Sequence, residues 1–450
     1  MNATVRHTLN KSLGRILLHD ILDPNNDFYI GIGKSDVFND TDTVVPAKDT
    51  IQEEREFRNN LQSIKKVEGA TFVTTRINWV SGTSYAAWDD TKTPETSENF
   101  YVLNESKELF LCLETGTDNA GNVQNSIVEP NCSLFSVDGE GNPDPTQPIT
   151  IPEDGYVWKY LLTLTPERIF QFLSSNYIPV GDPEDSLCAG DSIQDMQLLV
   201  REAAVGGEIT RVKILNGGEG YTSPVNITVE GDGDGTATAE ATVVGGVITK
   251  VKMTNYGSGY THASIKVTGG TSPASFQTVI TTSKGLGYDP VEDLKTSSVM
   301  LNIKPDGTEN GTFTVENTFR QIGILKNPKT PEGEMFSDVA AKVMSTVTLE
   351  EVSPFEPGIM LVGSNGGKMY VNESSDKVVH YHQNETTGFG DFVVGESVQQ
   401  EGVLGFATIE SISEKNGIDR STGEILYIEN RTRIRRDAEQ QEDIKVVIKV

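Results

Sequence analysis

The sequence contains little cysteine and no long apolar run. Its three cysteines, Cys112, Cys132 and Cys188, are an odd number without C-x-x-C spacing, which predicts free thiols rather than a disulfide framework or a four-thiolate zinc site. No stretch approaches the about 18 apolar residues of a membrane-spanning helix, and the N-terminus lacks the apolar core of a secretory signal. We therefore expect a protein that is made and kept in a cytoplasm.

Positive charge is scarce as well. The chain has 37 lysines and arginines against 65 aspartates and glutamates, which gives a formal net charge of −28. Nucleic-acid binding relies on a basic surface that contacts phosphates, and docking on an anionic membrane relies on the same charge. The composition therefore argues against both nucleic acid and a membrane as partners.

The residues that are abundant indicate strands. The 450 residues suffice for about three domains of ordinary size, and 43 glycines with many threonines, valines and asparagines favour strands and turns over helices. We predict a mostly β protein, with a multi-domain β-sandwich core, inserted β modules and a few short helices.

Three helices are predicted. Residues 3–22 carry apolar side chains at three- and four-residue steps, so this helix packs on its own domain or docks on a partner subunit. Residues 50–67 combine a capping Asp49 or Thr50, early acids and late lysines, which is typical of a surface helix. The pair Thr165-Pro166 opens a third, short helix.

Strands and one long loop make up much of the remainder. Residues 154–164 are apolar on both faces and should be central in a sheet. Residues 118–148 are rich in Asp, Asn, Gly and Pro, and we interpret them as a long solvated loop. Further strands are predicted at 28–33, 71–79, 100–104, 108–114, 299–303 and 312–325.

The end of the chain holds the clearest strand patterns. Residues 424–431 place apolar side chains on both faces, as in a buried strand, and residues 444–450 alternate like a half-exposed partner strand. A chain that ends on its two clearest strands closes its sheet last. Part of what precedes them should therefore be inserted modules.

A tandem repeat lies between Val205 and about Pro290. Residues 207–222 recur 39 positions later as residues 246–261, with 10 of 16 positions identical. Each copy offers a strand, a GxGY turn and a second strand, and a third GxGY ends at Tyr288. Glycines permit the positive φ angles of tight turns, and the tyrosine can fold back over them.

These patterns predict five segments. The core comprises residues 1–200, the strands of 291–329 and the closing strands of 421–450. Residues 201–290 form an inserted repeat module. Residues 330–420 form an inserted module like a small β-barrel, because short apolar runs alternate with glycines over 354–411.

No motif predicts a catalytic site. Gly33-Lys34-Ser35 resembles the end of a phosphate-binding loop, but Phe28 stands where that loop requires a glycine. The sequence has no GxSxG and no HExxH. Asp89 and Asp90 are a carboxylate pair of the kind that cleaves glycans, although such adjacency is expected by chance among 65 acids.

Two groups of residues bear on metal binding. His380 and His382 share one face of an extended segment, where they hold a metal with Glu385 or are simply exposed strand residues. The run 232–235 (DGDG) lacks the ligand spacing of a twelve-residue calcium loop, and a hairpin tip explains it. We predict no catalytic, cofactor-binding or metal-binding residues, and no cofactor.

Four arginines, Arg431, Arg433, Arg435 and Arg436, precede an acidic run at 437–443. We interpret them as local ion pairs or as a subunit contact rather than as a nucleic-acid site.

Three stretches, in order along the chain, resemble the baseplate wedge subunit, gene product eight, of T-even-type contractile-tailed phages. They are 154–161 (DGYVWKYL), 319–328 (FRQIGILKNP) and 423–431 (GEILYIENR) with the closing strand to Val450. Weaker similarity covers 28–38 (FYIGIGKSDVF) and 101–113. The repeat region and the 330–420 region look larger than in the T-even form, which suggests a version from a related phage group.

The resemblance implies a non-enzymatic virion protein. It would be a late protein, a homodimer of β-sandwich domains that joins neighbouring wedge subunits in the tail baseplate and is assembled in the host cytoplasm. Two alternatives stay open. One is a receptor- or glycan-binding tail protein, in which exposed Tyr221, Tyr260 and Tyr288 contact the ligand, and the other is a tail-associated hydrolase.

Overall fold

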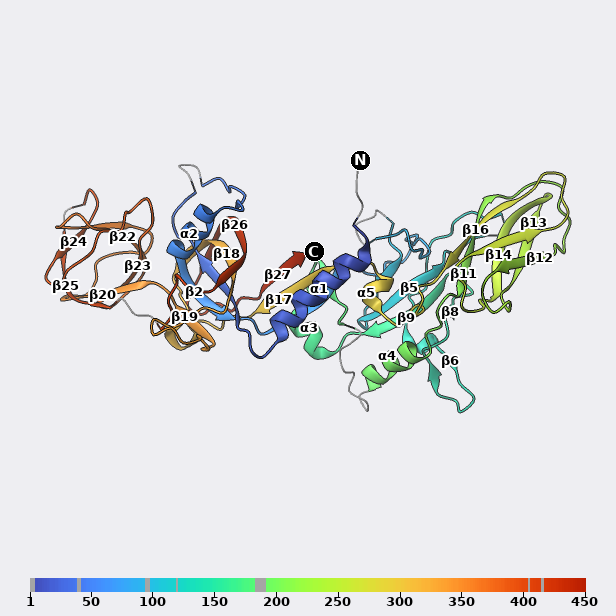
Figure 1. Cartoon of the computed structure of the whole chain (residues 1–450), viewed down its shortest axis with the longest axis horizontal. Helices are drawn as coiled ribbons and strands as arrows, with labels where there is room; N and C mark the ends of the chain where they lie inside the picture. The colour runs from blue at the N-terminus through green and yellow to red at the C-terminus, as the bar shows by residue number, and fades with distance from the viewer. Residues whose placement is uncertain are drawn as a thin grey trace. The chain divides into compact units, whose positions relative to one another are not determined.

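The computed structural model describes residues 5–38, 42–93, 98–118, 120–182, 192–403, 405–413 and 417–450, so Cys188 lies outside the described residues. The predicted mostly β fold is confirmed, with many small sheets, a barrel and few helices (Figure 1). Of the cysteines, Cys112 and Cys132 are free thiols, as predicted.

The described chain divides into two compact units. The first unit comprises Met1–Leu18, Thr71–Met300 and Val447–Val450, and the second comprises His19–Ala70 and Leu301–Val446. The finer boundaries of the five expected segments stay a prediction.

The first unit contains a four-stranded sheet in the order β4-β5-β9-β8. These strands are β4 (Tyr101–Leu103), β5 (Glu108–Glu114), β9 (Val157–Thr163) and β8 (Ile149–Thr150). β9 lies inside the sheet, as predicted, and its two faces enter different core clusters: Trp158 packs in one and Leu161 in the other. Helix α4 (Ser192–Glu202), which the sequence patterns did not predict, packs against β9.

The predicted solvated loop at 118–148 is wrong in part. It contains a 3-10 turn, η1 (Cys132–Leu134), and a short pair of strands, β6 (Ser136–Val137) and β7 (Pro143–Asp144). Its middle is fastened to the core, because the buried Ser126 accepts a hydrogen bond from the Trp79 indole at 3.1 Å. The polar composition of this segment gave no indication of these contacts.

The tandem repeat folds into three two-stranded sheets within the first unit. The first copy supplies β11 (Ile209–Asn216), β12 (Ile227–Gly231) and β13 (Thr238–Val244). The second supplies β14 (Val247–Asn255), β15 (Ala263–Val267) and β16 (Ser275–Ile280). The pairs are β11 with β16, β12 with β15 and β13 with β14, so in these three sheets every strand of one copy pairs with a strand of the other.

Backbone hydrogen bonds repeat this exchange between the copies. In each copy, one N–H of the first strand and the N–H of the tyrosine donate to backbone carbonyls of the other copy. The bonds come in two equivalent pairs, whose residues are 39 positions apart in the sequence. These bonds are Ile209 N–H to Tyr256 O (3.0 Å), Ile248 N–H to Gly217 O (3.0 Å), Tyr221 N–H to Gly246 O (2.9 Å) and Tyr260 N–H to Gly207 O (3.0 Å). The two copies therefore interlock around one core rather than folding side by side.

The GxGY turns form as predicted. Gly218 and Gly257 have φ angles of 65° and 62°, and a Cβ on either would lie within 3 Å of a ring carbon of Tyr221 or Tyr260. Both tyrosines are only 4% exposed, whereas the receptor-binding alternative requires them at the surface. Tyr288 is half-buried beneath the Lys284 ammonium. The expectation that these three rings are exposed is therefore wrong.

The second unit is built on a five-stranded sheet in the order β19-β2-β1-β18-β26 (Figure 1). Its strands are β19 (Ala340–Lys342), β2 (Leu61–Lys66), β1 (Phe28–Gly33), β18 (Asn317–Lys326) and β26 (Glu424–Arg436). The central pair β1–β18 is antiparallel and sets Gly31 opposite Gly323. Phe57 lies over these glycines, because a Cβ on Gly323 would be 2.4 Å from its ring.

Two expectations about the end of the chain are wrong. β26 is an edge strand whose side chains are half-buried or exposed up to its last residue, and not a buried strand. β27 (Ile444–Lys449) does not pair with it; β27 belongs to another sheet, in the order β10-β3-β17-β27. The other strands of that sheet are β10 (Tyr177–Pro179), β3 (Gly69–Thr75) and β17 (Ser298–Ile303).

The helices are partly as predicted. Helix α1 (His7–Leu22) and helix α3 (Pro166–Phe172) form, together with the short α5 (Pro290–Asp293). Helix α2 (Ile51–Asn60) ends well before Val67, so the predicted helix is wrong in its second half. Residues 61–66 pair as β2 with β1 and β19 and bury Leu61 and Ile64, and this tertiary gain outweighs the local helix preference of the lysines.

The predicted small barrel is confirmed in the second unit. Six strands close in the order β20-β23-β22-β21-β24-β25. They are β20 (Ser345–Leu349), β21 (Met360–Gly363), β22 (Lys368–Ser375), β23 (Val378–His382), β24 (Ser397–Gln400) and β25 (Ala407–Ser413). Their inward side chains form a separate apolar core that includes Val347, Leu361 and Val379.

Candidate functional site

The sequence candidates for catalysis do not assemble into a site. Gly33 ends β1, and among the described residues the next helix begins at Ile51, so the Gly-Lys-Ser run does not lead directly into a helix N-terminus. Asp89 is buried, whereas Asp90 is exposed. Burial opposes ionisation of Asp89, but its 2.7 Å ion pair with Lys213 and its hydrogen bonds from Thr91 lower its pKa to about 2. It is therefore a structural anion rather than half of a carboxylate pair.

The two barrel histidines lie on a strand, as expected, but neither of them is exposed. His382 is fully buried and His380 is half-buried, and burial lowers the pKa of each to about 4. His382 Nδ1 donates to the Asn372 side-chain oxygen at 2.7 Å, and its Nε2 lies 3.3 Å from the Asn384 amide nitrogen. The ring serves as a neutral hydrogen-bonding group inside the second unit.

The DGDG run is not a hairpin tip. It connects β12 to β13, two strands that belong to different sheets. The Asp232 carboxylate accepts hydrogen bonds from the Thr261 hydroxyl and N–H and from the His262 N–H, which lower its pKa. Within the part of the chain that the structure describes, no group of three or more His, Cys, Asp or Glu residues is arranged to hold a metal ion.

The arginine cluster at the end of β26 pairs locally, as predicted, for three of its four members. Arg431 contacts Glu429 at 3.6 Å, and Arg435 contacts Asp437 at 2.9 Å. Arg436 is fully buried; it pairs with Glu442, donates to the Thr314 carbonyl at 2.6 Å and lies over the Phe313 ring. Arg433 has no such partner among the described residues.

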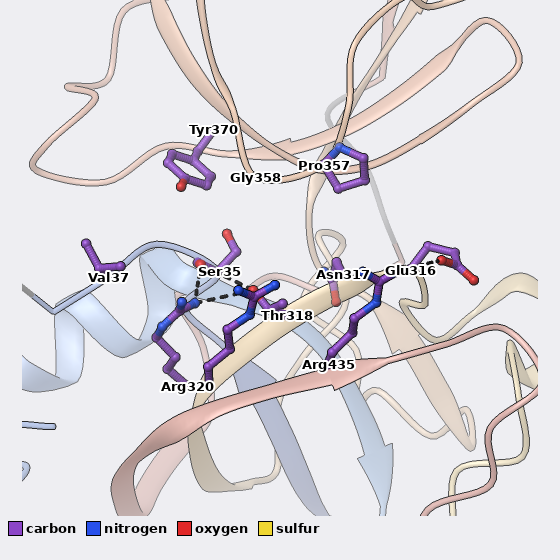
Figure 2. A pocket seen from close by; sticks show the side chains of 11 residues that line it. Ser35, Val37, Glu316, Asn317, Thr318, Arg320, Pro357, Gly358, Tyr370 and Arg435 are labelled. Atoms are coloured by element: carbon purple, nitrogen blue, oxygen red, sulfur yellow. Dashed lines mark hydrogen bonds and ion pairs between the residues drawn. The ribbon is translucent and has the colours of Figure 1, made fainter. Parts of the chain in front are cut away.

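Arg433 instead lines a pocket of about 280 Å³ in the second unit (Figure 2). We call it the arginine pocket, because three guanidinium groups border it. Its lining residues are Ser35, Val37, Glu316, Asn317, Thr318, Arg320, Pro357, Gly358, Tyr370, Arg433 and Arg435.

Two walls of different origin form the arginine pocket. β18 and β26 run antiparallel with Thr318 opposite Arg435, so alternate residues of both strands present their side chains on one face of the sheet. The facing wall belongs to the barrel: Tyr370 comes from β22 and Pro357 from the loop before β21 (Figure 2). Only the fold brings these segments together.

The arginines of the pocket are held to different degrees. Arg320 is 4% exposed; its guanidinium donates to Asp42 at 2.8 Å, to the Ser35 carbonyl and to the Thr318 hydroxyl. Arg435 is exposed and contacts Glu316 at 3.4 Å, while its hydrogen bond to Asp437 raises its pKa. Arg320 is thus a fixed part of the wall, and Arg433 is the member that is left to bind something else.

The tyrosine hydroxyl at the opposite wall is also available. Tyr370 is half-buried, its ring lies 5.5 Å from that of His382, and burial together with nearby Asp36 raises its pKa. Its hydroxyl makes no hydrogen bond with the described residues. At pH 7 it therefore remains a neutral donor at the barrel side of the pocket.

The arginine pocket is equipped for binding rather than for acyl transfer. The Ser35 hydroxyl accepts from the Asn372 amide at 3.1 Å, and Asn372 in turn separates it from His382. An amide cannot pass a proton from serine to histidine, so these three residues do not act as a nucleophile and its base. Guanidinium groups and a phenol suit the recognition of an oxyanion.

The pocket itself was not predicted from the sequence. The alternation of Arg431, Arg433 and Arg435 is the only local signal, since residues two apart share one face of a strand. Nothing in the sequence indicates that Tyr370 or Ser35 would join them.

The comparisons with known proteins assign no family. No model of a known protein family matches the chain, and no curated protein matches it in sequence. Among the described residues, no helix combines the length and the apolar character that crossing a membrane requires.

Proposed function

We propose that this chain is a non-enzymatic structural subunit of a contractile phage tail baseplate wedge, present in the virion and linking neighbouring wedge proteins. The observation that supports this proposal is where the resembling stretches lie in the fold. Residues 28–38, 319–328 and 423–431 contribute β1, β18 and β26, three neighbouring strands of one sheet. Residues 101–113 and 154–161 contribute β4, β5 and β9, three neighbouring strands of another.

This distribution favours a shared scaffold over chance similarity. Short matches that arise by chance would fall on strands and loops without regard to spatial order. Here they gather on neighbouring strands of two sheets and leave out the repeat module and the barrel. The virion context and the partners rest on the resemblance of these stretches.

The same proposal includes a homodimer, and we place its contact on α1. Leu9, Leu13 and Ile16 recur along α1 at steps of four and three residues, yet each is at least 43% exposed, whereas Gly14 faces the Phe72 ring of the first unit. Such a stripe has the spacing with which two helices pack along each other. A second copy related by a twofold axis presents the same stripe, so the surface complements itself.

The first test is the mass of the purified protein by light scattering, followed by co-expression with the other wedge proteins of its phage. We expect a dimer of 49.0 kDa chains that co-purifies with at least one wedge protein. Leu13→Asp should give a folded monomer, and Glu167→Lys, on α3, is the control for a changed surface charge. A folded monomer that binds no wedge protein would remove the proposal, and a trimer would favour the receptor-binding alternative.

The glycan-binding alternative loses the observation that motivated it, because Tyr221 and Tyr260 are buried. A glycan array would still decide between the two functions, since a structural subunit gives no specific signal.

A further inference from the structure

We propose that the arginine pocket binds the carboxylate of an acidic peptide segment from a partner protein. This inference goes beyond the structural role proposed above and does not depend on it. Arg433, Arg435 and the Tyr370 hydroxyl would contact the carboxylate, and Arg320 would hold the wall in place.

The charges that line the pocket are unbalanced. Three guanidinium groups border it, but Glu316 is the only carboxylate among the lining residues. The other acids that pair with these arginines, Asp42 and Asp437, are not part of the lining. Arg320 and Arg435 are thus paired within the chain, and Arg433 supplies the positive charge that a ligand in the pocket would meet.

Two hydrogen-bond donors that line the pocket, the Arg433 guanidinium and the Tyr370 hydroxyl, have no acceptor among the described residues. Arg433 is outside the ion pairs that its neighbours Arg431, Arg435 and Arg436 make within the described chain. Tyr370 lines the pocket from the barrel side, and Figure 2 shows its hydroxyl end turned toward the strands that carry the arginines. An oxyanion placed between them would satisfy both groups with charge-assisted hydrogen bonds.

The size of the pocket limits the ligand. A volume of about 280 Å³ lies just below the range of sites that hold drug-sized molecules, so it fits one or two side chains rather than a nucleotide cofactor. Val37 and Pro357 supply apolar surface beside the arginines, against which the methylene groups of a glutamate can pack. Arginine, moreover, matches the planar fork of a carboxylate with two parallel hydrogen bonds.

The net charge of the whole chain favours a short acidic peptide over nucleic acid as the ligand. With a net charge of −28, the protein surface around the pocket repels a long polyanion such as nucleic acid. Screening limits that repulsion to about 8–10 Å at ordinary ionic strength, so a peptide with one or two carboxylates can still reach the arginines. Inorganic phosphate offers related oxyanion chemistry and must be distinguished by experiment.

The test is fluorescence anisotropy of the full chain with a labelled six-residue peptide that carries two glutamates. A peptide with glutamines in their place serves as the ligand control. We expect the glutamate peptide to bind, Arg433→Gln to weaken it by about tenfold, and Tyr370→Phe to weaken it less, since a neutral donor contributes less than a charged one. Binding should also weaken as the salt concentration rises.

The matched control variant is Arg431→Gln. Arg431 lies on the same strand two residues before Arg433, is exposed and has the same charge, but it does not line the pocket. The Arg431→Gln variant should bind the peptide with a Kd within about twofold of the wild-type value, and thermal unfolding should show that both variants are folded.

Several results would overturn the inference. These are equal binding of the glutamate and glutamine peptides, equal loss in Arg431→Gln and Arg433→Gln, and no binding at low salt. Inorganic phosphate that displaces the peptide at concentrations below the peptide's own Kd would make phosphate the ligand instead. A failure here leaves the oligomer and co-purification results of the proposed function untouched.

Discussion

The two tyrosines of the repeat occupy equivalent positions but differ by one hydrogen bond. Tyr221 and Tyr260 are equally buried, and each packs over the glycines of its own turn. The Tyr221 hydroxyl also accepts from the Ala274 N–H at 2.9 Å. No such bond to the Tyr260 hydroxyl occurs among the described residues.

This difference predicts unequal effects of the same substitution. Tyr221→Phe should lower the free energy of unfolding by about 1 kcal/mol, because it removes one hydrogen bond and leaves an N–H unpaired. Tyr260→Phe, the internal control, should change it by less than about 0.5 kcal/mol. Urea unfolding curves measure both, and an equal loss would show that the Ala274 bond contributes nothing.

His382 predicts a pH dependence of stability. Its neutral ring donates from Nδ1 to Asn372 and faces the Asn384 amide with Nε2, so a second proton would meet a donor. The pKa is about 4 in the folded protein against 6.5 for an ordinary histidine. Between these pH values the unfolded chain binds a proton that the folded chain does not. The free energy of unfolding therefore falls as the pH falls through this window.

The matching measurement is unfolding by urea at several pH values from 7 to 4. His382→Gln should reduce the slope of stability against pH by up to about 1.4 kcal/mol per pH unit. His380, whose pKa is also lowered to about 4, should contribute a similar slope of its own. Parallel curves for the wild type and His382→Gln would contradict the assignment.

At the scale of elements, α2 is placed by a pair of glycines. Gly31 of β1 and Gly323 of β18 lie opposite each other, and the fully buried Phe57 ring of α2 fills the space that side chains would take. The close approach of helix and sheet thus depends on residues that carry no Cβ.

Gly323→Ala should therefore lower the free energy of unfolding by about 2–3 kcal/mol, because the new methyl group overlaps the Phe57 ring. In the double variant Gly323→Ala with Phe57→Leu, the smaller side chain makes room, so the combined loss should be less than the sum of the two single losses. Gly139→Ala, whose added Cβ would meet nothing within 4 Å, is the control. Strict additivity, measured by denaturant unfolding, would exclude the contact as the cause.

At the scale of the whole molecule, the repeat module joins the first unit through adjacent chain ends. The Gly207 N–H donates to the Thr282 carbonyl at 3.1 Å, and the Thr281 N–H donates to the Glu208 carbonyl at 2.9 Å. A module attached in this way can be removed without separating the segments that flank it.

Replacement of residues 208–281 by a two-glycine linker should therefore give a protein that still folds cooperatively and keeps its far-UV circular dichroism per residue. Some loss of stability is expected, since Val279 packs into the core of the first unit and Arg211 contacts Asp89 at 3.6 Å. A variant that aggregates or unfolds without a transition would show that the module is part of the core instead of an insertion.

Sequence patterns sufficed where the cause of the structure is local. The strands β5 and β9, the repeat with its GxGY turns, the glycine-punctuated barrel and the proline-initiated α3 were all predicted, because each depends on residues that are close in sequence. The burial of Tyr221 and Tyr260 was not predicted, because the local sequence around each ring does not show whether the other copy of the repeat covers it.

Only the tertiary structure decided the features that depend on distant partners. It ended α2 at Asn60, because Leu61 and Ile64 gain more from pairing beside β1 than from a further helical turn. It placed β26 and β27 in different sheets, and it brought Tyr370 of the barrel opposite Arg433 of β26. Composition and periodicity determine what each segment can form, whereas the choice among neighbours is made by burial and pairing across hundreds of residues, which no local pattern records.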